Sequence, residues 1–136
     1  MTDDKLLADA ARSPVARLAT IGASGVDLVP ITFALAGSTV VTAIDHKPKK
    51  TRLLQRLANI DGDPRVTVLI DHYDDNWASL WWVRLRGLAR VVDDGPRFAP
   101  AIELLVAKYP QHYARVRPAG PVIEIDVIDV RTWRAS

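Results

Sequence analysis

A short segment of the chain concentrates four cations, Lys47, Lys49, Lys50 and Arg52. They surround Pro48, where an extended run gives way to the helical pattern of residues 51–57. Proline favours the first helical position, so the cations crowd the helix end that already carries about half a positive charge. Because acids stabilise such an end, cations there indicate an anion from outside, and backbone N–H groups plus lysines suit a phosphate. The alternative is a solvated basic turn whose lysines point into water.

Other chemistries find little support in the sequence. The absence of cysteine excludes disulfides, thiolate zinc sites and cysteine nucleophiles. The three histidines are spread without metal-ligand spacing, and the acidic residues of 71–75 do not follow the calcium-loop pattern. No serine lies in a nucleophile-elbow context, and no glycine-rich nucleotide fingerprint is present. We therefore predict no metal site and name no catalytic side chain.

Composition is typical of a soluble globular protein. The 136 residues predict a single domain over 1–136, with 49% apolar and 25% charged residues. The net charge of only +2 makes general nucleic-acid binding a weak expectation. No run of about 18 apolar residues and no signal-peptide pattern is present, so we expect a cytoplasmic protein that binds neither nucleic acid nor membrane.

The order of apolar and turn residues predicts a mainly β protein with a few helices. Helical spacing covers residues 3–12, 51–57 and 96–109. Strand patterns cover residues 15–21, 26–35, 39–44, 65–71, 80–92 and 121–130. Gly87 within its strand, and a slip in alternation at Val127–Ile128, indicate a β-bulge. Six strands in short hairpins fit a closed or nearly closed antiparallel barrel, because closure removes exposed edges.

Several short motifs, in their order and spacing, carry a resemblance to a known family. They are Arg17-Leu18-Ala19-Thr20, Val29-Pro30-Ile31, Lys50-Thr51-Arg52, Asp63-Pro64-Arg65-Val66, Asn76-Trp77 and Val83-Arg84-Leu85-Arg86-Gly87. The chain resembles the split β-barrel flavin- and deazaflavin-dependent oxidoreductases, the superfamily of pyridoxamine 5′-phosphate oxidase, and within it the small branch that binds coenzyme F420. The family commonly passes quickly from the helix to the Asp-Pro-Arg turn, whereas residues 54–62 lengthen that passage here.

The resemblance implies a split, Greek-key, six-stranded antiparallel barrel of the FMN-binding type. It also implies a homodimer with the cofactor in a groove at the subunit interface. Lys50 and Thr51 match the family's phosphate-contacting positions, Arg52 follows in the motif, and Lys49 takes a more variable neighbouring position. Each charge-assisted hydrogen bond there would contribute roughly 1.5 to 3 kcal/mol.

Further cofactor contacts are implied by the same resemblance. Thr42, Ala43 and Pro30 match places where the family's backbone lies along the tricyclic ring. Trp77 matches a loop aromatic that reaches toward the partner subunit's cofactor, although packing is the commoner role of a tryptophan.

The implied function is coenzyme F420-dependent reduction, with hydride passing between the deazaflavin and a small organic substrate. One alternative is an FMN-dependent oxidoreductase of the pyridoxamine 5′-phosphate oxidase type, because the same corner would hold the FMN phosphate. A second is a flavin- or deazaflavin-binding protein without turnover, and a third is a small barrel that binds single-stranded nucleic acid. The substrate itself is not named by any residue pattern.

Overall fold

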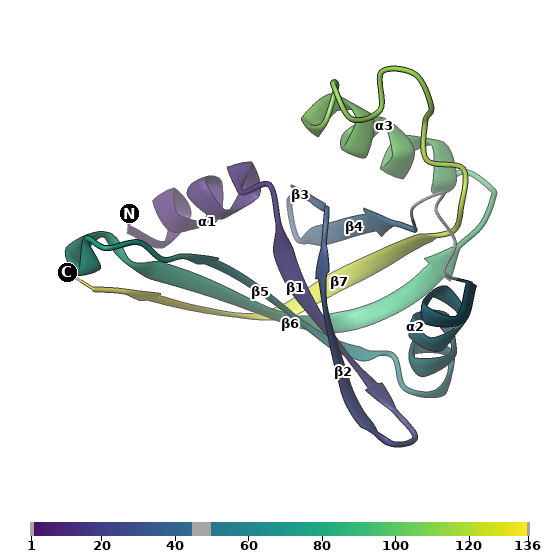
Figure 1. The fold of residues 1–136 in the computed structure, drawn as a ribbon, viewed down its shortest axis with the longest axis horizontal. Coiled ribbons are helices and arrows are strands. Elements are labelled where there is room, and N and C mark those ends of the chain that lie inside the picture. Colours follow the sequence, from purple (N-terminus) through teal and green to yellow (C-terminus); the bar gives the residue numbers. More distant parts are fainter. Residues whose placement is uncertain (1, 45–49, 136) are drawn as a thin grey trace.

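The computed structural model describes residues 2–44 and 50–135, with side chains over 4–44 and 55–135. A curved sheet with three α-helices around it makes up the fold (Figure 1). Its elements are α1 (Thr2–Arg12), β1 (Ala16–Gly22), β2 (Gly25–Ile31), β3 (Ala34–Ala36), β4 (Thr39–Ala43), α2 (Lys50–Gly62), β5 (Arg65–His72), the 3₁₀ turn η1 (Trp77–Ser79), β6 (Trp81–Val92), α3 (Phe98–Lys108) and β7 (Val122–Arg134). No helix in the described ranges is long and apolar enough to span a membrane.

All strand pairs are antiparallel, in the order β2-β1-β5-β6-β7-β4-β3. The two edge strands are successive in the chain, so the sheet must curl until its edges meet at residues 32–33. The predicted mainly β, antiparallel barrel class is confirmed. The predicted strand 26–35 is instead two strands, β2 and β3, because the chain turns at Thr32 and sends the fully buried Phe33 into the core. The described sheet therefore has seven strands rather than six.

Alternating side chains build the core inside this curl. Along β5, Val66, Val68 and Ile70 are buried while their neighbours are more exposed. Leu6 and Ala10 lie one helical turn apart on α1 and join the same cluster, so α1 closes one side of the barrel. Fully burying each large apolar side chain stabilises the fold by about 1.5–3 kcal/mol.

The predicted bulge is present where β6 meets β7. The register shifts between Arg86 and Gly87, and Gly87 pairs with Val127 while Arg86 pairs with Asp129, which leaves Ile128 unpaired. A Cβ on Gly87 would lie 2.3 Å from the backbone oxygen of Asp126. Only glycine therefore allows the two strands to approach at this bend.

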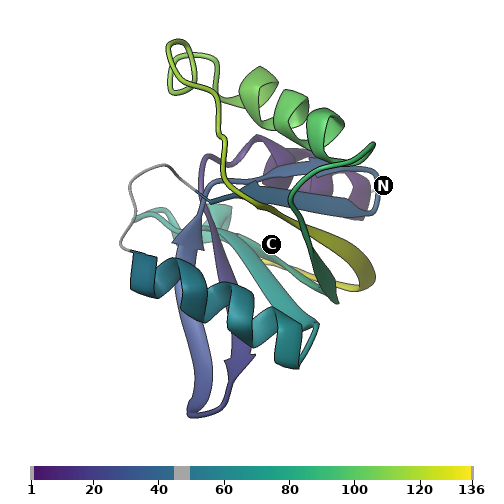
Figure 2. The same cartoon turned by 90° about the vertical axis from the view of Figure 1, so that its right-hand side faces the viewer.

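Helices α3 and α2 lie on opposite sides of the strands (Figure 2). At the end of α3 the Tyr109 hydroxyl accepts a hydrogen bond from the Phe33 backbone N–H at 3.1 Å and lies 2.9 Å from the Pro14 carbonyl oxygen. Beside it, the Lys108 Nζ is buried 3.5 Å from the centre of the Phe33 ring, with no hydrogen-bond partner among the described residues. Burial lowers the pKa of Lys108 from 10.5 to about 8.

This lysine generates a prediction about stability and pH. Because the folded protein binds the Lys108 proton less tightly than the unfolded chain does, its stability penalty is fully present below about pH 8 and declines as the pH rises toward 10.5. Lys108→Met should raise the free energy of unfolding at pH 7 by on the order of 1 kcal/mol, allowing for partial exposure to solvent. Urea unfolding at pH 7 and 9.5 measures the free energy of unfolding of both proteins. The difference between variant and wild type should be smaller at pH 9.5 than at pH 7. A variant less stable than wild type at pH 7 would contradict this account.

Candidate functional site

The basic motif opens helix α2, which begins at Lys50 and places Lys50, Thr51 and Arg52 in its first turn. The first N–H groups of an α-helix have no partner within the helix, so this end offers donors as well as the helix dipole. Lys49 lies outside the described residues, as do the side chains of Lys50, Thr51 and Arg52. The phosphate contacts of these residues therefore stay a prediction.

Strand β4 ends just before this corner. Thr42 and Ala43 have buried side chains, and the Thr42 hydroxyl donates a hydrogen bond to the Thr32 carbonyl at 2.6 Å. Strand β3 pairs with residues 39–41 of β4 only, so Thr42 and Ala43 have no strand partner on that side. Both residues are almost fully buried within the single chain, and their contact with a cofactor ring stays a prediction. Pro30, exposed on β2, pairs with Arg17 across the β1–β2 hairpin.

Trp77 lies far from this corner within the chain. It begins the 3₁₀ turn η1 and is 75% exposed. The turn η1 lies at the end of the sheet opposite α2 (Figure 1). A contact between Trp77 and a cofactor at the α2 corner would therefore have to involve a second chain. The sequence led us to expect that Trp77 reaches the cofactor of the partner subunit, and this contact stays a prediction.

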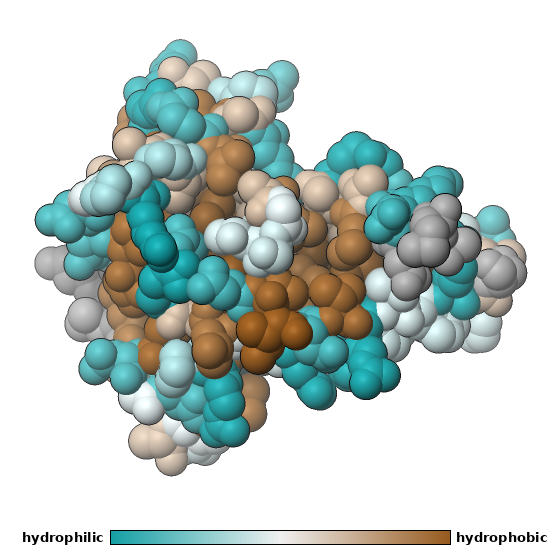
Figure 3. Space-filling model, turned by 180° about the vertical axis from the view of Figure 1, so that it is seen from behind, coloured by the Kyte–Doolittle hydropathy of each residue, from teal (hydrophilic) through white to brown (hydrophobic). Residues whose placement is uncertain are grey.

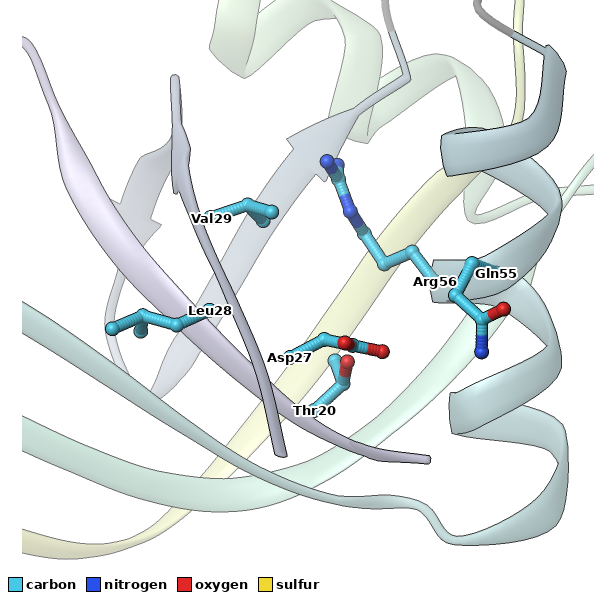
Figure 4. A pocket seen from close by; sticks show the side chains of 6 residues that line it. All are labelled: Thr20, Asp27, Leu28, Val29, Gln55 and Arg56. Atoms are coloured by element: carbon cyan, nitrogen blue, oxygen red, sulfur yellow. The ribbon is translucent and has the colours of Figure 1, made fainter. Parts of the chain in front are cut away.

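A pocket of about 210 Å³ separates α2 from the β1–β2 hairpin (Figure 4). Two strands and one helix line it, through Thr20, Asp27, Leu28, Val29, Gln55 and Arg56. The two helix residues come from the lengthened part of α2. Arg56 was not among the residues predicted from the sequence, although it follows Arg52 by four positions and such a spacing places two side chains on one helix face.

Asn59 organises the polar wall of the pocket. It is 3% exposed, and its Nδ2 donates to Asp27 Oδ2 at 2.6 Å and to Thr20 Oγ1 at 3.0 Å. Its Oδ1 accepts a hydrogen bond from Gln55 Nε2 at 2.8 Å. Gly22 makes room for this amide, because a Cβ there would lie 2.7 Å from Oδ1. These bonds fix the position of the Asp27 carboxylate.

Arg56 brings a positive charge to the pocket, and the acidic residue of its lining, Asp27, is not within ion-pair distance of the guanidinium. Among the described residues it has no carboxylate within ion-pair distance, although its side chain is half-buried. Burial lowers the pKa of the guanidinium. In Figure 4 the Arg56 side chain rises from α2, and its guanidinium lies across from Val29, toward the start of the helix. In the part of the chain that the structure describes, no cluster of His, Asp or Glu could hold a metal ion.

Comparison with known proteins gives a family and a fold. The sequence pattern of the pyridoxamine 5′-phosphate oxidase family matches residues 2–134. No curated protein sequence matches the chain. A candidate pyridoxamine 5′-phosphate oxidase from Listeria innocua is 21% identical, with a TM-score of 0.71 and full coverage of both chains.

Two further solved structures have the same fold. An FAD-binding protein from Mesorhizobium loti is 15% identical, with a TM-score of 0.73, and the match covers 97% of this chain and 92% of that one. The haem storage protein HutZ from Vibrio cholerae is 11% identical, with a TM-score of 0.70 and coverage of 97% and 93%. At these identities the likeness establishes the fold and leaves the ligand open.

The wall of the pocket generates a prediction about Asn59. Asn59→Asp keeps the shape of the side chain but removes both donors and places a carboxylate beside Asp27. We expect a loss of about 2–4 kcal/mol in the free energy of unfolding at pH 7, with a smaller loss at pH 5, where protonation relieves the repulsion.

The matched control is Gln55→Ala, which removes a single bond from the exposed side of the same amide and should cost less than about 1.5 kcal/mol. Thermal unfolding of both variants checks the comparison. Equal stability of Asn59→Asp and wild type would show that the hydrogen bonds of Asn59 do not hold the pocket wall.

Proposed function

Because the chain belongs to the pyridoxamine 5′-phosphate oxidase family, we propose that it binds a flavin-type redox cofactor between β2, β4 and α2 and acts as an oxidoreductase. The cofactor we favour is the deazaflavin coenzyme F420, and the substrate is a small organic molecule. The observation that carries the proposal is the start of α2 at Lys50, which sets the basic motif at a helix N-terminus after the end of β4.

The chain's own residues would bind and orient the cofactor. Backbone N–H groups at the start of α2, with Lys50, Thr51 and Arg52, would hold the phosphate, and Lys49 would add charge nearby. The backbone at Thr42 and Ala43 would support the ring from one side, with Pro30 on the neighbouring strand. When bound, such a cofactor supplies hydride transfer to or from an electron-poor double bond. The protein contributes chiefly proximity, orientation and exclusion of water.

Three observations bear on the choice of ligand. Resemblance to the F420-binding branch rests on motifs such as Lys50-Thr51-Arg52 and Asn76-Trp77. The FAD-binding protein of the same fold keeps FMN as the alternative cofactor. The haem storage protein of the same fold supports a second candidate, binding without turnover. The identity of the bound ligand therefore decides the function. Titration of the protein with F420, FMN, FAD and haemin side by side identifies that ligand.

We also propose that two chains form a homodimer that completes the site. On the β1–β2 hairpin Val26 is 69% exposed and Leu28 66%, and Ile128 at the β7 bulge is 69% exposed. Ile128, Val26 and Ile21 line one hollow on the outside of the sheet. From behind, apolar residues form a broad band over the molecule (Figure 3). Exposed apolar surface of this kind is typical of an interface, and a second chain could bring Trp77 to the cofactor.

The phosphate corner generates a prediction about affinity. Lys50→Ala should weaken binding of F420 or FMN about tenfold or more, because a charge-assisted hydrogen bond contributes about 1.5–3 kcal/mol. The melting temperature of the cofactor-free protein should stay nearly unchanged. Fluorescence or absorbance titration measures the affinity for each of the two cofactors.

Lys5→Ala, on the exposed surface of α1, is the matched control and should leave affinity unchanged. If the Lys50 variant bound F420 and FMN with unaltered affinity, the assignment of the cofactor's phosphate to this corner would be wrong. Failure of every ligand to bind the wild type would remove the proposed function itself.

The apolar outer surface generates a prediction about assembly. Ile128→Glu should convert a dimer into monomers, because it places a charge in the apolar interface. Analytical ultracentrifugation measures the oligomeric state of the variant and the wild type. Leu104→Glu, on the exposed side of α3, is the control. A monomeric wild type, or a dimer unaffected by Ile128→Glu, would place the interface elsewhere or remove it.

A further inference from the structure

Arg56 differs from Arg17 and Arg90, which are also half-buried but form ion pairs with described carboxylates. The guanidinium of Arg90 donates to Glu124 Oε1 at 2.9 Å and to Asp126 Oδ2 at 2.7 Å, so its charge is neutralised twice. Arg56 has no such partner among the described residues, although it lines a pocket and loses part of its hydration. A charge that is removed from water without a partner destabilises the fold. Unlike the unpaired amine of Lys108, the Arg56 side chain lines a pocket, so a partner from outside the chain can reach it.

The pocket's own polar groups do not fill this role. The Asp27 carboxylate is held by Asn59 at 2.6 Å, and the Gln55 amide donates to the same asparagine. The other side is apolar, through Leu28 and Val29. Among the described polar side chains that line the pocket, Arg56 is therefore the one without a hydrogen-bond or ion-pair partner. An anion entering between β2 and α2 would meet it directly.

The position of Arg56 on α2 relates it to the phosphate corner. It lies six residues after Lys50, about 9 Å along the helix axis. Side chains on a helix lean toward its N-terminus, and in Figure 4 the guanidinium extends in that direction. The planar fork of arginine binds phosphate and carboxylate oxygens in pairs. Arg56 can therefore reach the anionic chain of a ligand whose phosphoryl group lies at the first turn.

We infer that Arg56 is a cofactor-binding residue that holds an anionic oxygen of the cofactor's phosphorylated side chain, so that affinity depends on this charged chain more than on the ring. The inference rests on the proposed function and deepens it, since it names the part of the ligand that the pocket reads. It also predicts that the pocket takes inorganic phosphate in the absence of any ring.

The test compares ligands with and without the charged chain. Arg56→Gln should weaken FMN and F420 binding about tenfold or more, while riboflavin and the deazaflavin chromophore that lacks the phosphorylated side chain should change less than about threefold. Arg56→Lys should recover part of the loss, because lysine keeps the charge but not the fork. Arg12→Gln on α1, which loses a surface ion pair with Asp9, is the matched control. It should leave the affinities for ligands with and without the charged chain unchanged.

A second readout separates binding from a structural role. Removing an unneutralised guanidinium should leave the melting temperature of cofactor-free Arg56→Gln equal to or above that of wild type. Inorganic phosphate should raise the wild-type melting temperature, and less so in the variant.

The inference would be overturned if Arg56→Gln lost the same affinity for ligands with and without the charged chain. Unchanged affinities, or a lower melting temperature of cofactor-free Arg56→Gln, would also overturn it. Each of these outcomes leaves the proposed function intact if FMN or F420 still binds in a Lys50-dependent manner. If no flavin or deazaflavin binds but phosphate stabilises the protein through Arg56, the anion site is supported and the redox function fails.

Discussion

The hydroxyl of Thr42 donates to the carbonyl of Thr32 at 2.6 Å, and the rest of the structure depends on the closure that this contact holds. It ties β4 to the link between β2 and β3, where the two edges of the curved sheet meet. The Thr32–Thr42 contact brings the end of β2 close to β4, and α2 packs on β1. The candidate site is the space left between β2, β4 and α2. A flat sheet of the same strands would keep β2 and β4 apart and would leave the basic motif isolated.

Two buried cations show how differently the fold treats charge. The amine of Lys108 lies against the Phe33 ring, in the packing between α3 and the core, and no ligand role is assigned to it. The guanidinium of Arg56 lies at a pocket between α2 and the β1–β2 hairpin. Both cost stability because burial disfavours the charged form. Of these two cations, Arg56 lines a pocket formed by described residues, so a ligand bound there could return the lost free energy.

The fold alone leaves the chemistry open. An FAD-binding protein and a haem storage protein share it with this chain at low identity. Function in such folds depends on the few side chains around the cofactor. In the proposed site these are the start of α2, the end of β4 and Arg56, and they would select for an anionic side chain on the ligand before they select for a particular ring.

The sequence by itself determined most local elements, the bulge at Gly87 and the family, because alternation, helical spacing and turn residues act over a few neighbours. It also placed a basic motif at a helix start. It could not separate β2 from β3, since the turn at Thr32 depends on Phe33 finding the core, nor could it give the order of the strands. Arg56 was missed for the same reason. Its burial and lack of a carboxylate arise from strand β2, more than twenty residues away in the chain, and only tertiary packing brings that strand across the helix.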